Sequence, residues 1–178
     1  MKIEHKIAAW AGGLLFIGLF VAYTFEYQWI ENTFGAGKLV GKSIAVGVGC
    51  GLSLAWYLRK NADDLESRLR LWSSCVLIAA FFSPLFGSLS NRFLSPHPVE
   101  MRPFEFWEEK PYATRLYGIF RGEKTTPDGY YIFVMRDGEL KRLKSKTPRF
   151  GHLQRGDRVE LPVKRGLWKH DFVLVKQI

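Results

Sequence analysis

Three long apolar runs constrain this chain more than any other feature of its sequence. The runs cover residues 7–24, 39–58 and 71–89, and short polar connections separate them. A helix needs roughly 20 mostly apolar residues to cross the hydrocarbon core of a bilayer, and each run approaches that length. The sequence therefore predicts a transmembrane domain over residues 1–92, with three helices at about 7–28, 39–59 and 70–90.

The charged residues divide the chain near residue 92. Residues 1–92 hold 15 charged residues, whereas residues 93–178 hold 28. Such a change of composition marks a domain boundary. The net charge of +9 favours anionic partners, namely membrane lipid headgroups or a small anionic ligand. The acidic residues in the second half disfavour a nucleic-acid partner.

Small residues recur at four-residue intervals along the second and third predicted helices. Small residues at this spacing let a second helix approach closely, so we expect these two helices to pack together. Self-association of two chains through the same residues is the alternative. Pro84 removes one helical hydrogen bond, and Ser83 is expected to compensate the freed carbonyl. The predicted packing residues are Gly37, Gly41, Ala45, Gly47, Gly49 and Gly51 in the second helix and Ala79, Ser83 and Gly87 in the third.

Tryptophans and cations predict the orientation of the helices. Three alternating spans place Trp10, Trp56 and Trp72 at one interface, as in an aromatic belt. The side that holds the N-terminus and the loop 59–70 has six cations, against four on the other side. The positive-inside rule then predicts a cytoplasmic N-terminus and an extracytoplasmic C-terminal domain. The compact chain without low-complexity tails favours a bacterial inner membrane.

Residues 93–111 are predicted to form a proline-rich linker. Four prolines in this range exclude a helix and make a semi-stiff spacer. The aromatic stretch 104–107 alternates with charged residues, which is typical either of a first short strand or of a segment at the membrane surface.

Residues 112–178 are predicted to form a small antiparallel β-barrel of the OB or SH3 kind. Short strands are expected at 113–121, 130–136, 139–144, 158–163 and 171–176. A turn is expected at 125–129, and Asp137-Gly138 is a two-residue hairpin signal. The predicted core consists of Leu116, Ile119, Ile132, Val134, Leu140, Val159, Leu161, Phe172 and Leu174.

One basic cluster in the second half is a candidate binding site. Its cations suit lipid phosphates or an anionic ligand, although lysine on an exposed strand also prevents edge-to-edge aggregation. The neighbouring Tyr130, Tyr131 and Phe133 are of the types that stack on bases, but filling a small core explains alternate members equally well. The cluster consists of Lys141, Arg142, Lys144, Lys146 and Arg149.

Motifs for catalysis, metal binding or cofactor binding do not occur in the sequence. The four histidines share no ligand spacing, and both cysteines fall in predicted helices, where they suit packing. Ionisable residues are missing from the middle of each span, which disfavours a transporter. We therefore expect a non-catalytic assembly or adaptor subunit that presents its β domain to a partner, with a protein partner or a homo-oligomer within the membrane. The alternative is a ligand-gated membrane effector whose β domain senses a small anion such as a nucleotide.

Overall fold

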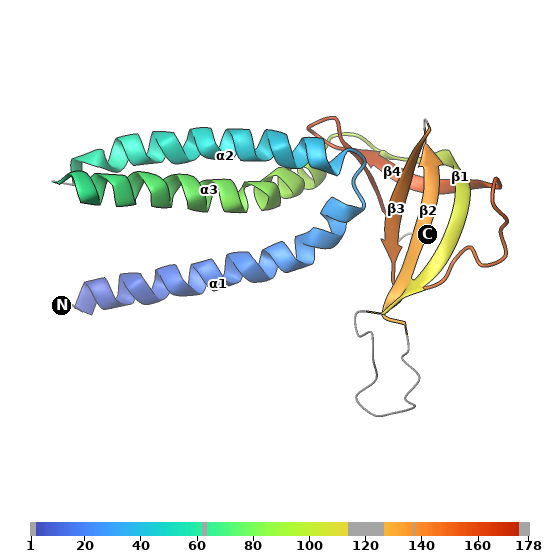
Figure 1. The fold of residues 1–178 in the computed structure, drawn as a ribbon, viewed down its shortest axis with the longest axis horizontal. Helices are drawn as coiled ribbons and strands as arrows, with labels where there is room; N and C mark the ends of the chain where they lie inside the picture. The colour runs from blue at the N-terminus through green and yellow to red at the C-terminus, as the bar shows by residue number, and fades with distance from the viewer. Residues whose placement is uncertain (1–2, 62–63, 114–126, 137, 175–178) are drawn as a thin grey trace, which may run out of the picture. The chain divides into compact units, whose positions relative to one another are not determined.

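The computed structural model describes residues 3–61, 64–113, 127–136 and 138–174. It divides into a helical unit, Met1–Ile30 with Gly35–Leu94, and a β unit, Glu31–Phe34 with Ser95–Ile178. Three long apolar helices are followed by a five-stranded antiparallel and nearly closed β-barrel (Figure 1). This architecture confirms the predicted fold class.

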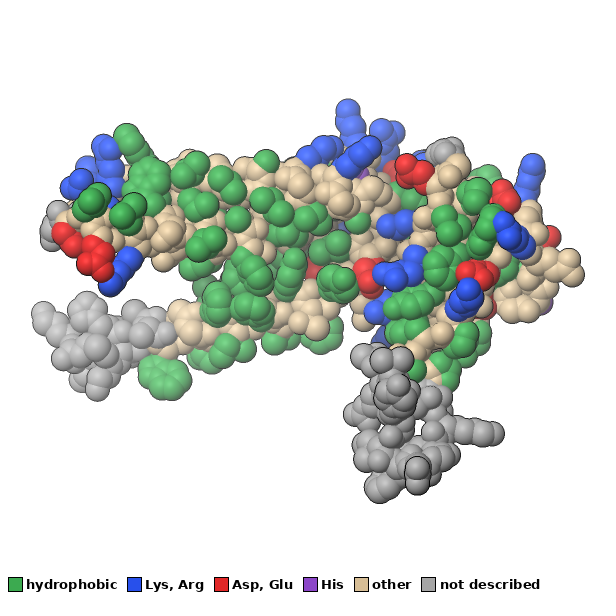
Figure 2. Space-filling model, viewed as in Figure 1, with side chains coloured by type: hydrophobic (Ala, Val, Ile, Leu, Met, Phe, Trp, Pro, Cys, Tyr) green, Lys and Arg blue, Asp and Glu red, His purple; other side chains and the backbone are tan. Residues whose placement is uncertain are grey.

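The three helices are α1 at Ile3–Glu31, α2 at Ala36–Leu58 and α3 at Leu65–Phe93. A short 3-10 turn, Arg59–Asn61, follows α2. Each helix is long enough and apolar enough to cross a membrane. Hydrophobic side chains cover the helices, whereas charged side chains gather near helix ends and on the β unit (Figure 2). The predicted helix boundaries fall within a few residues of those observed.

The helices α2 and α3 pack closely because α2 buries a line of mostly small residues. Every fourth residue from Leu39 to Ala55 is buried, and Gly47 and Gly51 lie in this line. The rings of Trp56 and Trp72 are 6.5 Å apart, which agrees with the predicted placement of these two residues at one interface. The four-residue spacing that predicted this pair of helices therefore describes their contact.

The helix α3 continues through Pro84 because a neighbouring side chain replaces the missing hydrogen bond. Proline lacks an N–H and cannot bond to the carbonyl four residues earlier, which is that of Ala80. The Ser83 hydroxyl donates to this carbonyl oxygen at 2.8 Å. The expected compensation by Ser83 is confirmed.

The β unit is a single sheet with the strand order β3-β2-β1-β4-β5. All neighbouring strands are antiparallel. The bounds are β1 Val99–Tyr112, β2 Gly129–Arg136, β3 Glu139–Ser145, β4 Arg158–Arg165 and β5 Asp171–Val173.

The central strand β1 corrects the predicted linker. Residues 93–111 were expected to be a spacer, but Val99–Tyr112 pairs with β2 on one side and β4 on the other. Alternating Phe104 and Phe106 are buried, so this segment contributes to the core despite its prolines. A barrel that began at residue 112 would lack its middle strand. The strand interpretation of residues 104–107 was the correct one.

The barrel core comes from alternating residues of β1, β2 and β4. Of the predicted core, Ile132, Val134, Val159, Leu161 and Phe172 are buried. Leu140 is instead 50% exposed and Leu143 takes the core position, because inward-facing Ile132 pairs with Leu143. Leu174 is only half-buried. Residues 114–121 of the predicted strand, residues 125 and 126 of the predicted turn and the core positions 116 and 119 lie outside the described residues.

The predicted hairpin between β2 and β3 is confirmed. Arg136 pairs with Glu139, which leaves two connecting residues, and Gly138 has a φ of 80°. Only glycine enters this region without strain. We therefore expect Gly138→Val to destabilise the barrel by at least ~1–2 kcal/mol, the usual cost of a left-handed residue. Thermal unfolding of the full-length protein measures this, and Gly151→Val, where a side chain meets open space, is the control.

Candidate functional site

The most unusual feature of the β unit is that the connection between α1 and α2 is built into it. We call Glu31–Phe34 the closing segment. The Phe34 N–H donates to the Asp171 carbonyl at 2.7 Å, and the Val173 N–H donates to the Asn32 carbonyl at 3.1 Å. These bonds attach the closing segment to the edge strand β5.

The closing segment also bonds to β3, the other edge of the sheet. The Asn32 side chain accepts a hydrogen bond from the Lys144 N–H at 2.9 Å and donates to the Lys144 carbonyl at 3.4 Å. Lys141 Nζ donates to the Thr33 carbonyl at 2.7 Å. Because β3 and β5 are the two ends of the strand order, the closing segment bridges the gap through which the sheet would otherwise stay open.

Burial and ring stacking hold the closing segment in place. Asn32 and Thr33 are almost fully buried. The Phe34 ring stacks on that of Phe104, with 5.5 Å between ring centroids and an angle of 6° between the planes. Gly35 then takes a left-handed conformation with a φ of 66°, which turns the chain into α2.

The contacts of the closing segment bear on how α2 and α3 could cross a membrane. The two helices α2 and α3 separate Phe34 from Ser95 along the chain. Two crossings return a chain to the side from which it left. If α2 and α3 both cross a membrane, the closing segment and residues 95–178, which form one unit, lie on the same side of it.

Three residues of the predicted basic cluster contact the closing segment. Arg142 and Lys144 form ion pairs with Glu31, with nitrogen–oxygen distances of 3.4 and 3.6 Å. Lys141 is half-buried, and its Nζ donates to the Thr33 carbonyl. Burial lowers the pKa of Lys141, the charge of Arg142 lowers it further, and Glu31 opposes both. These cations thus bind the chain's own carboxylate and carbonyl groups.

The other two members of the basic cluster lie outside this contact. Lys146 and Arg149 are exposed in the segment that follows β3. The backbone N–H groups of Arg149 and Phe150 donate to the two carboxylate oxygens of Glu109 at 2.9 and 3.1 Å. The five predicted cations therefore do not form one site.

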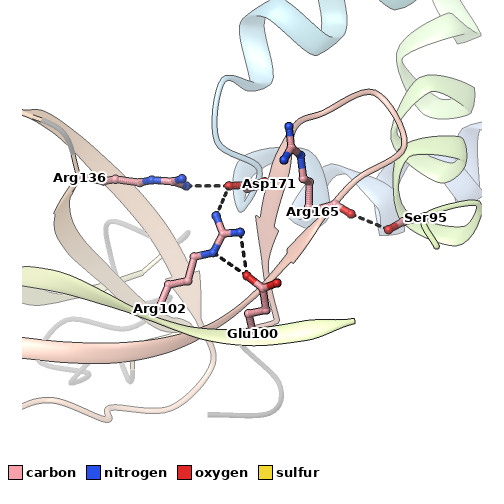
Figure 3. A network of polar contacts seen from close by, with 6 residues as sticks. All are labelled: Ser95, Glu100, Arg102, Arg136, Arg165 and Asp171. Atoms are coloured by element: carbon pink, nitrogen blue, oxygen red, sulfur yellow. Dashed lines mark hydrogen bonds and ion pairs between the residues drawn. The ribbon is translucent and has the colours of Figure 1, made fainter. Parts of the chain in front are cut away.

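Asp171 connects three elements of the barrel beside the closing segment. It accepts hydrogen bonds or ion pairs from Arg102 at 2.8 Å and Arg136 at 3.0 Å, both to Oδ2 (Figure 3). Arg136 also lies over the Phe34 ring, 4.9 Å from its centroid. The hydrogen bond to Glu100 raises the pKa of Arg102 most, and Asp171 raises it further. This network joins β1, β2 and β5 around Phe34.

The outer face of β2 carries large side chains that the core does not use. Tyr131, Phe133 and Met135 alternate with the buried Ile132 and Val134 and are only half-buried. The Tyr131 ring stacks on that of Tyr112 at 4.3 Å, and the Arg142 guanidinium lies 4.7 Å from the Tyr131 centroid. Leu140 of β3 pairs with Met135 and is half exposed. We call Tyr131, Phe133, Met135 and Leu140 the outer apolar face.

The structure brings together only some of the predicted helix-packing residues. A Cβ added to Gly47 would lie 2.5 Å from the Ser83 Cβ and 2.8 Å from the Ala79 carbonyl oxygen. Gly51 approaches the backbone of Cys75 and Val76, and Gly87 approaches Ser43. A Cβ at Gly37, Gly41 or Gly49 would meet open space, and Ala45 is exposed.

A buried ion pair joins α1 to α3, and sequence reasoning did not find it. Glu26 is only 4% exposed, accepts a hydrogen bond from the Ser88 hydroxyl at 2.7 Å and pairs with Arg92 at 2.6 Å. The Arg92 guanidinium also lies over the Trp29 ring, 4.4 Å from its centroid. One signal was available in the sequence. Glu26 follows the C-terminal end of the first apolar run, and Arg92 follows the C-terminal end of the third.

The closing segment was also not predicted. Its sequence, Glu-Asn-Thr-Phe before a glycine, resembles any polar connection between two helices. The Phe34 side chain is the one hint, because an aromatic residue in a short polar connection tends to find a buried partner. Which partner it has depends on strands more than 60 residues away, and local pattern cannot supply that.

Removal of the Asn32 side chain is expected to weaken the contact between the closing segment and β3. The Asn32→Ala variant leaves the Lys144 N–H and carbonyl without their partner in a partly buried position, which costs about 1–3 kcal/mol. Thermal unfolding of the full-length protein measures the loss. Gln154→Ala, which removes an exposed amide, should change stability by less than about 0.5 kcal/mol. Equal effects of the two substitutions would contradict the role of Asn32.

The fold and these contacts define a chain with three membrane-length helices and a small β-barrel into which the first interhelical connection is built. Comparison with models of known protein families, with curated proteins and with solved structures finds no match to this chain. Among the residues that the structure describes, no group of three or more His, Cys, Asp and Glu side chains could hold a metal ion.

Proposed function

We propose that this protein is a non-catalytic assembly or adaptor subunit that presents its β-barrel to a protein partner at the membrane surface. The outer apolar face carries the proposal. Tyr131, Phe133, Met135 and Leu140 lie outside the core and remain partly exposed. Aromatic residues and methionine, flanked by arginine, are enriched at the centres of protein interfaces.

The double attachment of the barrel supports this role. The barrel joins the helices through the closing segment and again through Ser95, which follows α3. An adaptor needs its binding domain to stay near the membrane, and two short connections limit the distance over which the domain can move.

We further propose that the N-terminus is cytoplasmic and that the barrel faces the opposite side of a bacterial inner membrane. The excess of cations on the side of the N-terminus and of the α2–α3 connection supports this orientation. Protease accessibility of the barrel in intact cells and in inverted vesicles tests it. Cleavage in inverted vesicles alone would contradict the orientation.

Photocrosslinking in living cells tests the adaptor proposal. A photoreactive amino acid at position 140 samples the outer apolar face, and the same amino acid at position 160 samples an exposed residue of β4. We expect a discrete crosslinked protein at position 140 that is weak or missing at position 160. Identical patterns at the two positions, or no product at either, would contradict the proposal.

The contacts of Glu31 also favour the second candidate function, a ligand-gated effector. Glu31 lies between Arg142 and Lys144, which flank the stacked rings of Tyr131 and Tyr112. An external anion with an aromatic base could displace the carboxylate, because it offers both the charge and the stacking surface. Displacement would loosen the closing segment and so connect ligand binding to α1 and α2.

Thermal unfolding with ATP as the probe tests this second function. ATP should raise the unfolding temperature of the full-length protein in detergent, and Arg142→Ala with Lys144→Ala should remove that shift. Lys146→Ala is the control cation, because it lies outside the contact with Glu31. No shift with ATP, or a shift that the double variant retains, would contradict ligand gating.

A further inference from the structure

The loop between β4 and β5 combines exposed apolar side chains with cations. Leu167 at its tip is 47% exposed, Trp168 is half-buried, and Arg165 and Lys169 on either side are exposed. The loop has a defined conformation, because the Gly166 N–H donates to the His170 carbonyl at 3.0 Å and the Lys169 N–H donates to the Gly166 carbonyl at 3.0 Å. Lys169 has a φ of 64°, which closes the turn.

Both ends of this loop are bonded to residues that adjoin membrane helices. The Ser95 hydroxyl donates to the Arg165 carbonyl at 2.5 Å (Figure 3), and Ser95 is two residues beyond the end of α3. The Phe34 N–H donates to the Asp171 carbonyl at 2.7 Å, and Phe34 is two residues before the start of α2. Two residues span at most about 7 Å. Each end of the loop is therefore connected to a helix by one hydrogen bond and two residues of chain.

The charges around the loop suit an anionic surface. Arg165 and Lys169 are joined by Lys164 of β4, and Val99 of β1 pairs with Lys164 and adds exposed apolar area. The nearest acidic residue in sequence, Asp171, is already engaged by Arg102 and Arg136. Interfacial segments combine leucine and tryptophan with flanking cations in this way, since the apolar groups enter the headgroup region and the cations contact phosphates.

We propose that the β4–β5 loop is a membrane-contact site, in which Leu167 and Trp168 insert into the interface of a bilayer and Arg165 and Lys169 bind anionic phospholipid headgroups. The site goes beyond the adaptor role, which depends on a different face of the barrel. It would attach the barrel directly to lipid, in addition to the covalent connections of the barrel to the helices.

Fluorescence quenching in lipid nanodiscs tests the proposal with the full-length protein. Cys50→Ala and Cys75→Ala leave a background without cysteine, into which Leu167→Cys or Gln154→Cys places one environment-sensitive fluorophore. Gln154 is the control, because it is exposed and precedes the far end of β4, where Arg158 lies about 23 Å from Arg165 along the strand. The lipids are phosphatidylcholine with or without phosphatidylglycerol, and the quencher is a nitroxide attached near the headgroup end of a lipid chain.

We expect the fluorophore at position 167 to be quenched several-fold more than that at position 154 in nanodiscs that contain phosphatidylglycerol. Arg165→Glu with Lys169→Glu should lower the quenching at position 167 to the level of the control, while the Arg165 carbonyl keeps its bond to Ser95. Equal quenching at both positions overturns the proposal, as does quenching at 167 that the two charge reversals leave unchanged. Protection of position 167 from both the lipid quencher and aqueous iodide, the result for a protein partner, also overturns it.

Discussion

Replacement of both Gly47 and Gly51 by leucine is expected to separate α2 from α3. A Cβ at Gly51 would lie 2.8 Å from both the Cys75 carbonyl oxygen and the Val76 Cα, and these backbone atoms cannot rotate away as a side chain can. Overpacking costs about 1–3 kcal/mol at one site, and two such sites on one face act on the same helix contact. Thermal unfolding in detergent, together with size-exclusion chromatography, measures the loss of the packed state.

The same helix supplies a matched control for this prediction. Gly41→Leu with Gly49→Leu makes the same chemical change twice on α2, at positions where a side chain meets open space. We expect this pair to leave unfolding almost unchanged within a single chain. If it destabilised the protein as strongly as the first pair, glycine content and not the α2–α3 contact would explain the effect. If only Gly41→Leu with Gly49→Leu abolished an oligomer of the protein, copies of the chain would associate through the part of α2 that carries these two glycines.

Removal of Arg92 alone is expected to have the second large effect. The Arg92→Met variant keeps the apolar stem but leaves Glu26 buried without its cation, and breaking a buried ion pair from one side costs about 3–5 kcal/mol. The Ser88 hydroxyl offsets only part of this cost, because it supplies one neutral hydrogen bond. The expected result is loss of the α1–α3 contact, read as faster proteolysis and a lower unfolding temperature.

A double substitution separates the ion pair from the packing around it. Glu26→Gln with Arg92→Met removes both charges, so it should restore most of the stability that Arg92→Met loses. Glu66→Gln with Arg70→Met removes an exposed pair on α3 and should change stability by less than about 1 kcal/mol. If the double substitution at Glu26 and Arg92 were as unstable as Arg92→Met alone, the uncompensated carboxylate would not be the cause.

Local patterns were sufficient where a structural feature depends on neighbours in sequence. Apolar run length predicted the helices, four-residue spacing predicted the α2–α3 contact, and Asp137-Gly138 predicted the hairpin. The spacing did not identify which glycine line faces α3. Gly47 and Gly51 lie at the contact whereas Gly41 and Gly49 do not, because the rotation of a helix depends on all its partners.

Features that depend on distant parts of the chain were not predictable in the same way. The β1 segment contains two prolines and many charges, yet partners on both sides and the inward Phe104 and Phe106 make it the central strand. The cations of β3 were interpreted as a candidate site for an external anion or as protection of an exposed strand, because Glu31, their partner, lies in a different predicted domain. The sequence pattern of β3 cannot show that the carboxylate that pairs with its cations belongs to the connection between α1 and α2.

Native-state hydrogen exchange of three backbone amides would test most directly whether the closing segment completes the barrel. The amides are those of Phe34, Lys144 and Val173. The amides of Phe34 and Val173 join the closing segment to β5, and the amide of Lys144 joins it to β3. If the segment is part of the barrel, they exchange as slowly as the amides of β1, and Asn32→Ala accelerates the exchange of Lys144. If Phe34 and Lys144 instead exchange as fast as the amide of the exposed Gly151, the segment is an ordinary interhelical connection and the barrel is open between β3 and β5.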